Sequence, residues 1–197
     1  MSEAAERIDG RAARAARTRS AIVEAHLALI EEGDLRPTGE RIADRAGVSL
    51  RALWANFRDM EALFRASGER LRERQESLYR PIPQELPFHR RIDEFCRQRA
   101  RILELIAPSA RAAALLEPFS AQLRANRTTT IEWERREISE LFGAELSALG
   151  PGRDEALHAI TVVSTWAGWA MMRDVLGLDV DQSTAIMART LTSLLTR

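Results

Sequence analysis

The sequence has no lysine, a single cysteine and no long hydrophobic run. All 29 basic residues are arginine, and 29 acidic residues bring the formal net charge to zero, so no overall positive field marks a nucleic-acid-binding protein. The one cysteine, Cys96, excludes a disulfide within the chain and a zinc site built from several cysteines. No apolar segment approaches the roughly 18 residues of a membrane helix, and none follows the charged N-terminus as in a secretory signal. We therefore expect a cytoplasmic protein with no membrane partner.

Hydrophobic residues make up 45 % of the sequence, which is enough for a buried core and too much for a disordered chain. They recur at helical spacing, and the alternation typical of strands is missing. The pattern predicts an all-α protein of about nine helices. We expect them over residues 14–32, 60–79, 88–106, 109–116, 118–149, 153–176 and 180–196, with two short helices between 38 and 57. Pro108 is predicted to end one of them.

Residues 38–57 have the pattern of two short helices joined by a tight turn. Thr38 and Ser49 are of the residue types that cap helix N-termini, and Gly47 tolerates the positive φ that a turn between helices requires. Leu53 and Phe57 are four residues apart and are predicted to face inward together. The pattern indicates a helix-turn-helix, whose second helix exposes one face to a DNA major groove. An ordinary helical hairpin is the alternative.

The same segment contains a set of short motifs: Ile42-Ala43, Ala46-Gly47-Val48-Ser49, Trp54-x-x-Phe57 and Glu61-Ala62-Leu63. Together they resemble the DNA-binding domain of the tetracycline-repressor (TetR) family of bacterial transcriptional regulators. The resemblance covers about residues 18–65, a third of the chain. The C-terminal two thirds resemble the family only in length, helical content and layout.

The resemblance implies a DNA-binding domain over residues 14–60 and a helical effector-binding and dimerisation domain over 61–197. Residues 1–13 are polar and Ala-rich, and their composition predicts a flexible N-terminal arm. The implied function is that of a transcriptional regulator, a repressor that binds a pseudo-palindromic operator in double-stranded DNA as a homodimer. An unknown small-molecule effector would release it. No cofactor and no metal are expected.

The second helix of the motif is predicted to read the DNA bases. Arg51 is the candidate base reader, because an exposed Arg pairs bidentately with O6 and N7 of guanine. Leu50 and Ala52 either pack on thymine methyl groups or only fill the helix. The resemblance and the positions at caps and groove edges make Thr38, Ser49, Trp54 and Asn56 candidate phosphate contacts, and Gly39 would let a phosphate approach backbone N–H groups.

Two positions depart from the family pattern. Trp54 stands where the family commonly has Tyr, and Met60 where it commonly has a phosphate-binding Lys. The indole N–H of Trp54 and the guanidinium of Arg58 are the candidate replacements. Five arginines precede the motif and either follow the DNA or form a plain solvated arm: Arg7, Arg11, Arg14, Arg17 and Arg19.

The last two helices are predicted to form the homodimer, as the last two helices do in the resembling family. A stripe of small residues permits close helix packing, and the final helix has an apolar face. The candidate dimerisation residues are Ser164, Ala167, Gly168, Met171, Leu191, Leu194 and Leu195. The alternative is that these stripes pack only within the monomer.

The middle helices would then hold the effector pocket that the resemblance implies. The candidate lining residues are Phe95, Phe119, Trp133, His158, Trp166 and Trp169. Each of these side chains is alternatively a plain core residue. Three tryptophans among them indicate an apolar or aromatic effector.

The two other classes of function to consider are an enzyme and a helical adaptor. An enzyme is not expected, since Glu155 and His158 have the Glu-x-x-His spacing of a di-metal bundle but the second pair that such a site needs is missing. His26 lies in an apolar stripe and is predicted to be a core residue. The remaining alternative is a helical adaptor that binds a ligand or a protein and has lost sequence-specific DNA binding.

Overall fold

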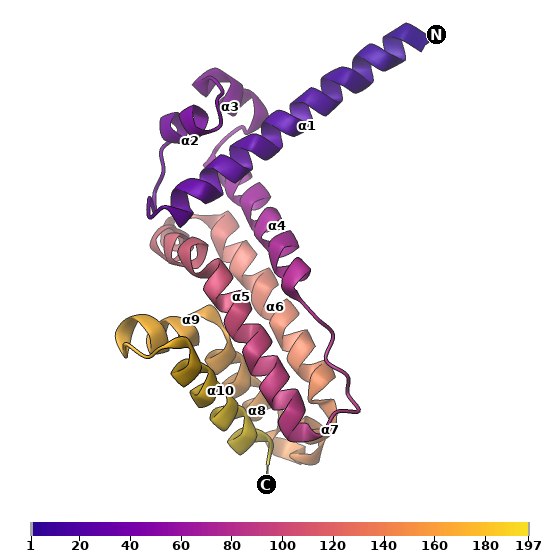
Figure 1. Cartoon of the computed structure of the whole chain (residues 1–197), viewed down its shortest axis with the longest axis vertical. Coiled ribbons are helices and arrows are strands. Elements are labelled where there is room, and N and C mark those ends of the chain that lie inside the picture. The colour runs from indigo at the N-terminus through magenta and orange to yellow at the C-terminus, as the bar shows by residue number, and fades with distance from the viewer. Residues whose placement is uncertain (1, 197) are drawn as a thin grey trace. The chain divides into compact units, whose positions relative to one another are not determined.

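The computed structural model describes the backbone of residues 2–196 and the side chains of residues 12–196. Over that range the chain is all-α, as the sequence predicts, with ten α-helices and no strand (Figure 1). The helices are α1 (Ser2–Glu31), α2 (Gly39–Arg45), α3 (Leu50–Asn56), α4 (Met60–Leu78), α5 (Phe88–Leu116), α6 (Ala121–Leu141), α7 (Gly143–Ala148), α8 (Arg153–Ser164), α9 (Trp166–Ala170) and α10 (Val180–Leu195). Three short helical turns join them: η1 (Glu117–Phe119), η2 (Gly150–Gly152) and the π-helical η3 (Met171–Val175). None of the described helices combines the length and apolarity that crossing a membrane requires.

The chain divides into two compact units, and α4, α5 and α6 contribute residues to both. Unit 1 comprises Met1–Glu73 and Pro108–Asn126, and unit 2 comprises Arg74–Ala107 and Arg127–Arg197. This division differs from the boundary at residue 60 that the sequence suggested. The reason is that the first turns of α4 belong to the core of unit 1 through the buried side chains of Leu63 and Ala66.

Unit 1 is built around α1, α2, α3 and the first half of α4. Figure 1 shows α2 and α3 lying against the C-terminal part of α1, and both helices contact it. The core consists of buried apolar side chains from residues 22–66: Ile22, Val23, Ala25, Leu27, Leu29, Ile42, Ala43, Leu53, Phe57, Leu63 and Ala66. The start of α6 joins this unit, since the Gln122 backbone N–H donates to the Glu61 carboxylate at 2.8 Å.

The imidazole of His26 lies in the interior of unit 1, 4 % exposed. Its Nδ1 is 2.8 Å from the Ser67 hydroxyl, and its ring lies 5.9 Å from that of Phe64. Burial lowers the pKa of His26 from 6.5 to about 4, although the Asp34 carboxylate acts in the opposite direction. His26 is therefore a neutral core residue at pH 7, as its place in the apolar stripe predicts.

Helix α1 begins at Ser2, so the backbone is helical over residues 2–13 of the segment that was predicted to be a flexible arm. Ala, Arg and Glu dominate this segment and are all strong helix formers, which accounts for the difference. The side chains of residues 1–11, with Arg7 and Arg11, lie outside the described part of the structure.

Pro108 does not end a helix, and the prediction of separate helices over 88–106 and 109–116 is wrong. Helix α5 continues through Pro108 to Leu116. A proline inside a helix has no backbone N–H to donate, and its ring crowds the carbonyl four residues earlier. Burial on both sides of the proline offsets that cost, since Ile106 and Ala112 are both buried.

In unit 2, Arg99 of α5 pairs with Glu134 and Glu137 of α6, and α8 contacts α10. The buried apolar side chains include Phe95 and Cys96 of α5, Phe142 before α7, Trp169 of α9 and Leu191 of α10. Cys96 is fully buried, as expected of a small core residue, and this burial raises the pKa of its thiol to about 12.

A sharp bend divides the segment 153–176, which was predicted as one helix. Helix α8 ends at Ser164, Thr165 is extended with ψ 168°, and α9 starts at Trp166. The bend brings the Cα of Gly168 so close to the preceding turn that a Cβ there would lie 2.5 Å from the Val162 carbonyl oxygen. Glycine is thus required at position 168 by packing within the chain.

We expect Gly168→Ala to lower the free energy of unfolding by about 1–3 kcal/mol, because the obstructing atoms belong to the backbone and must move. Gly152→Ala is the matched control, since its φ is −79° and nothing lies within 4 Å of the added Cβ. Urea unfolding followed by circular dichroism measures both. Equal stability of the two variants would show that the bend tolerates a side chain.

Candidate nucleic-acid interface

Helices α2 and α3 form a helix-turn-helix whose turn is fixed by backbone hydrogen bonds. The Gly47 N–H donates to the Asp44 carbonyl at 3.1 Å, and the Val48 N–H donates to the Ala43 carbonyl at 3.0 Å. These two bonds make a Schellman motif, which requires the left-handed backbone that Gly47 adopts with φ +66°. The predicted turn around Gly47 is therefore present.

Both short helices are capped at their N-termini by the residues that the sequence suggested. The Thr38 Oγ1 accepts from the Arg41 N–H at 3.4 Å, and the Ser49 Oγ accepts from the Ala52 N–H at 3.1 Å. The Ser49 hydroxyl keeps its own hydrogen for donation to another group, whereas the Thr38 hydroxyl also contacts the Glu40 carboxylate and helps to lower the pKa of Glu40. On the inner side Leu53 is fully buried, and Phe57, the residue after α3, is 1 % exposed.

Arg19 of α1 fixes the C-terminal end of α3. Its Nη1 donates to the Asn56 carbonyl at 2.7 Å, and its guanidinium lies 4.1 Å from the centre of the Phe57 ring. A cation at a helix C-terminus is stabilised by the unpaired carbonyls there. Arg19, which was grouped with the arginines of the N-terminal arm, is therefore a structural residue. Sequence reasoning missed this contact because Arg19 and Asn56 are 37 positions apart along the chain.

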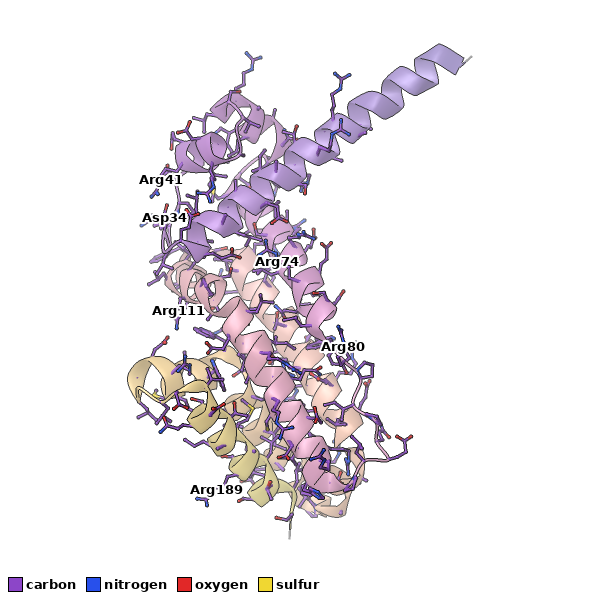
Figure 2. All side chains as sticks on the ribbon, viewed as in Figure 1. Asp34, Arg41, Arg74, Arg80, Arg111 and Arg189 are labelled. Atoms are coloured by element: carbon purple, nitrogen blue, oxygen red, sulfur yellow. The ribbon has the colours of Figure 1, made fainter. Side chains whose placement is uncertain are left out.

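The outer face of α3 presents one cation between two large apolar side chains. Arg51 is exposed, Leu50 is 36 % exposed and Trp54 is 38 % exposed, while Ala52 is half-buried. Among the described residues no carboxylate pairs with Arg51. The cations of α2 differ in this respect, since Arg41 pairs with Asp34 at 2.6 Å (Figure 2).

The indole of Trp54 lies over the N-terminus of α2. A Cβ at Gly39 would lie 2.7 Å from Cζ2 of Trp54 and 3.3 Å from Cδ1 of Leu50. The missing side chain of Gly39 therefore makes room for the indole, whereas the sequence interpretation reserved that space for a phosphate group. The indole N–H has no acceptor among the described residues, so it remains free to donate.

The two other phosphate candidates have contacts of their own. Asn56 Nδ2 donates to the Ala52 carbonyl at 2.8 Å, so its amide turns back along α3. Arg58 is 82 % exposed, and its Nε lies 3.0 Å from the Asp59 carboxylate. Asp59 also caps α4, since its Oδ1 accepts from the Ala62 N–H at 2.8 Å. Arg58 can exchange its exposed ion pair with Asp59 for a phosphate, whereas the Asn56 amide is already hydrogen-bonded to the backbone of α3.

The six residues predicted to line an effector pocket are not brought together. Phe95 and Trp169 are buried core residues of unit 2, where the Trp169 Nε1 donates to Glu104 at 2.7 Å. His158 is exposed on α8, Trp166 is half-buried, and Phe119 of unit 1 is 87 % exposed. Of the six, Trp133 alone lines the cavity that unit 2 does contain.

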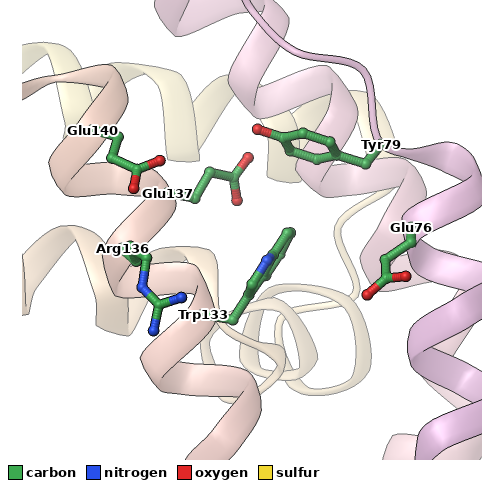
Figure 3. Close-up of a pocket in the computed structure, with 6 residues that line it drawn as sticks. All are labelled: Glu76, Tyr79, Trp133, Arg136, Glu137 and Glu140. Carbon is green, nitrogen blue, oxygen red and sulfur yellow. The ribbon is translucent and has the colours of Figure 1, made fainter.

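That cavity has a volume of about 190 Å³ (Figure 3). Its walls come from the last turn of α4, the residue after it, and α6: Glu76, Tyr79, Trp133, Arg136, Glu137 and Glu140. The rings of Tyr79 and Trp133 meet edge to face, 5.7 Å apart and at 73°.

A buried ion cluster lies next to this cavity. The guanidinium of Arg99, 1 % exposed, donates to Glu134 at 2.8 Å and to Glu137. The second oxygen of Glu134 has no hydrogen-bond partner. Burial raises the pKa of Glu134 to about 7 against the pull of Arg99, and burial also raises the pKa of Glu137.

The residues predicted to form the dimer divide between the interior and the surface of unit 2. Ser164, Leu191 and Leu195 are buried within the monomer, and Gly168 packs against the carbonyl of Val162. Leu194 is half-buried, and of the seven only Ala167 and Met171 are exposed. The other large apolar side chains that are exposed on the described C-terminal helices and turns are Val162, Val175, Leu176 and Ile186. Ser164, Leu191 and Leu195 thus turn toward the monomer core, whereas Ala167 and Met171 lie on the surface.

No three His, Cys, Asp or Glu side chains in the described part of the chain lie together in a way that could hold a metal ion. Glu155 and His158, which share the spacing of a di-metal ligand pair, are both exposed on α8.

The residues that resemble the tetracycline-repressor family thus lie in one helix-turn-helix and the helix that follows it. The whole chain was also compared with protein-family models, curated proteins and solved structures. No family model matches it, and neither a curated protein nor a solved structure does.

Proposed function

We propose that this protein is a DNA-binding transcriptional regulator of the tetracycline-repressor type. The supporting observation is the exposed face of α3, where Arg51 has no carboxylate partner among the described residues. In this proposal α3 enters the major groove, Arg51 pairs with a guanine, and Leu50 contacts a neighbouring base. Trp54, Ser49 and Thr38 would donate to phosphates at the groove edge.

The proposal includes a homodimer and a pseudo-palindromic operator. One short recognition helix reads too few base pairs for useful specificity, and a two-fold pair doubles the site. The exposed apolar side chains of the C-terminal helices support pairing, since Met171 is 53 % exposed, Val162 67 % and Val175 69 %. Burying such residues against a second copy is favourable because it removes apolar area from water.

Release by a small molecule completes the proposed function of a repressor. An effector that prefers the conformation with misplaced recognition helices would lower operator affinity by shifting the population. The cytoplasm is the compartment in which such a regulator acts.

Operator selection from random double-stranded DNA, at two salt concentrations, tests the proposal. We expect the wild type to enrich a pseudo-palindrome and to bind more weakly as salt rises. Arg51→Ala is expected to relax one symmetric pair of positions, with a loss of about 1–3 kcal/mol of discrimination at each. Arg58→Ala should weaken binding uniformly across sequences, because a phosphate contact carries no sequence information.

Arg90→Ala is the matched control, since Arg90 is exposed at the start of α5 in unit 2. It removes one positive charge without touching the helix-turn-helix, so its selected sequence should equal that of the wild type. Failure of the wild type to enrich any sequence at either salt concentration would overturn the proposal.

A helical adaptor without DNA specificity is the second candidate function. One observation favours it, namely that α3 exposes Leu50 and Trp54 beside a single charged side chain, Arg51. Aromatic and apolar residues around one Arg are also common at protein interfaces. A partner that binds wild type but not Trp54→Ala, with no selected DNA sequence, would establish this function.

A further inference from the structure

The cavity lined by Tyr79 and Trp133 in unit 2 has no part in the helix-turn-helix, and its size and lining indicate what it could bind. Its volume of about 190 Å³ is below the roughly 300–1,000 Å³ of sites for drug-sized ligands. A ligand that fills it is therefore small. The cavity is formed entirely by residues of unit 2, so its shape depends on the packing of that unit alone.

Two aromatic rings make the apolar part of the cavity wall. Tyr79 and Trp133 meet edge to face at 73°, so a ligand in the cavity lies against this ring pair. The negatively charged face of an aromatic ring attracts a cation within about 6 Å. Trp133 already holds one cation in this way, since the Arg99 guanidinium lies 5.7 Å from its ring.

The charged part of the wall is mainly acidic. Glu76, Glu137 and Glu140 line the cavity against a single cation, Arg136. The pKa of the Tyr79 phenol is raised, first by burial and then by Glu137 and Glu140. Added negative charge is thus disfavoured at this place, and positive charge is favoured.

Glu137 is the carboxylate of the wall that can accept a hydrogen bond from a ligand while it keeps its ion pair with Arg99. Its side chain is 8 % exposed, and one oxygen accepts from Arg99. No donor to the other oxygen lies among the described residues. Figure 3 shows the carboxylate pointing toward the Tyr79 and Trp133 side chains that line the cavity. This oxygen is open to the cavity, where a ligand N–H would donate to it.

We propose that this cavity binds a small organic cation, with an ammonium group at Glu137 and an apolar body against the Tyr79 and Trp133 ring pair. The inference deepens the proposed function, because it names the chemical class of the effector. Cation binding is measured without DNA, so the cation site and the proposed DNA-binding function can fail separately.

Isothermal titration of the full chain with 2-phenylethylammonium tests the proposal. The neutral isostere 2-phenylethanol and the anion 3-phenylpropionate are titrated beside it. We expect one cation to bind per chain and the neutral molecule to bind at least about tenfold more weakly, because it cannot form the charged contacts. The anion should not bind, since carboxylates outnumber Arg136 in the wall.

Variants of the exposed Glu140 and the half-buried Tyr79 avoid changes in the buried core. Glu140→Gln is expected to weaken cation binding about three- to tenfold, and Tyr79→Leu by a similar factor. Glu85→Gln, an equally exposed carboxylate outside the cavity, should bind like the wild type. An unchanged affinity in both Glu140→Gln and Tyr79→Leu would place the ligand elsewhere and overturn the proposal.

The remaining outcomes are equally decisive. Equal affinity for the cation and 2-phenylethanol, tighter binding of the anion, or no cation binding at millimolar concentration would each overturn the inference. Cation binding with an unchanged affinity for a selected operator would confirm the cavity as a cation site and contradict its role as effector site. A selected operator without cation binding would support the regulator and reject the cation site.

Discussion

Replacing Arg99 by methionine is expected to lower the free energy of unfolding by about 3–5 kcal/mol. Arg99 is 1 % exposed, and its guanidinium is the counter-charge that Glu134 and Glu137 share in the interior of unit 2. Methionine fills a similar volume but leaves both carboxylates buried without a cation. Urea unfolding followed by circular dichroism gives the loss of stability.

The pH dependence of this loss separates charge from packing. Without Arg99 the folded-state pKa of both carboxyls rises further above the unfolded value. The folded variant then binds more protons, and its stability increases as the pH falls. We expect the deficit of Arg99→Met at pH 5 to be smaller than at pH 8. An equal deficit at both values would mean that the lost contacts with Phe95 and Trp133, at 5.2 and 5.7 Å, cause it.

A triple variant gives the matching control. Arg99→Met combined with Glu134→Leu and Glu137→Gln removes the orphaned charges along with the cation. Apolar replacement of a whole buried ion cluster is often neutral or stabilising. Most of the lost stability should therefore return in the triple variant.

Acidification is expected to destabilise unit 1 through His26. The folded-state pKa of His26 is about 4 and its ordinary value is 6.5. Between these values the unfolded chain binds a proton that the folded chain does not bind, so stability falls as the pH falls through this window. The loss reaches about 2 kcal/mol at pH 5 and up to about 3 kcal/mol near pH 4.

His26→Gln isolates this effect from that of Glu134. The pKa of Glu134 is raised from 4.5 to about 7, so its contribution to stability falls as the pH rises and opposes that of His26. The wild type and His26→Gln both contain Glu134, so the contribution of Glu134 cancels in the difference between their free energies of unfolding. The stability advantage of the wild type over His26→Gln should shrink by about 2 kcal/mol between pH 7 and pH 5. A pH-independent difference would contradict the buried neutral imidazole.

The local structure of the helix-turn-helix could be predicted from sequence because short-range chemistry determines it. Thr38 and Ser49 each cap a helix by accepting from the backbone N–H three residues ahead, and Gly47 takes the positive φ that its turn requires. Each of these features depends on neighbours within a few positions. The anchoring of α3 by Arg19 could not be predicted, since it joins residues that only folding brings together.

The features that sequence reasoning missed depend on tertiary packing. Proline propensity predicted a helix end at Pro108, but buried neighbours on both sides keep α5 continuous. Periodicity found the apolar stripes of the last helices, yet it could not tell a face turned toward the monomer core from one turned outward. Of the predicted pocket aromatics, only Trp133 lines the cavity described above, whose wall also contains the acidic residues Glu76, Glu137 and Glu140.

The buried thiol of Cys96 makes this chain a convenient subject for site-specific labelling. A thiol with a pKa of about 12 and no exposed surface has almost no thiolate at neutral pH and no access to a maleimide. A cysteine introduced at the exposed Ala55 of α3 would therefore take up a fluorophore or spin label alone, with no need to remove the native thiol. The distance between two such labels in a dimer would report the separation of the recognition helices directly.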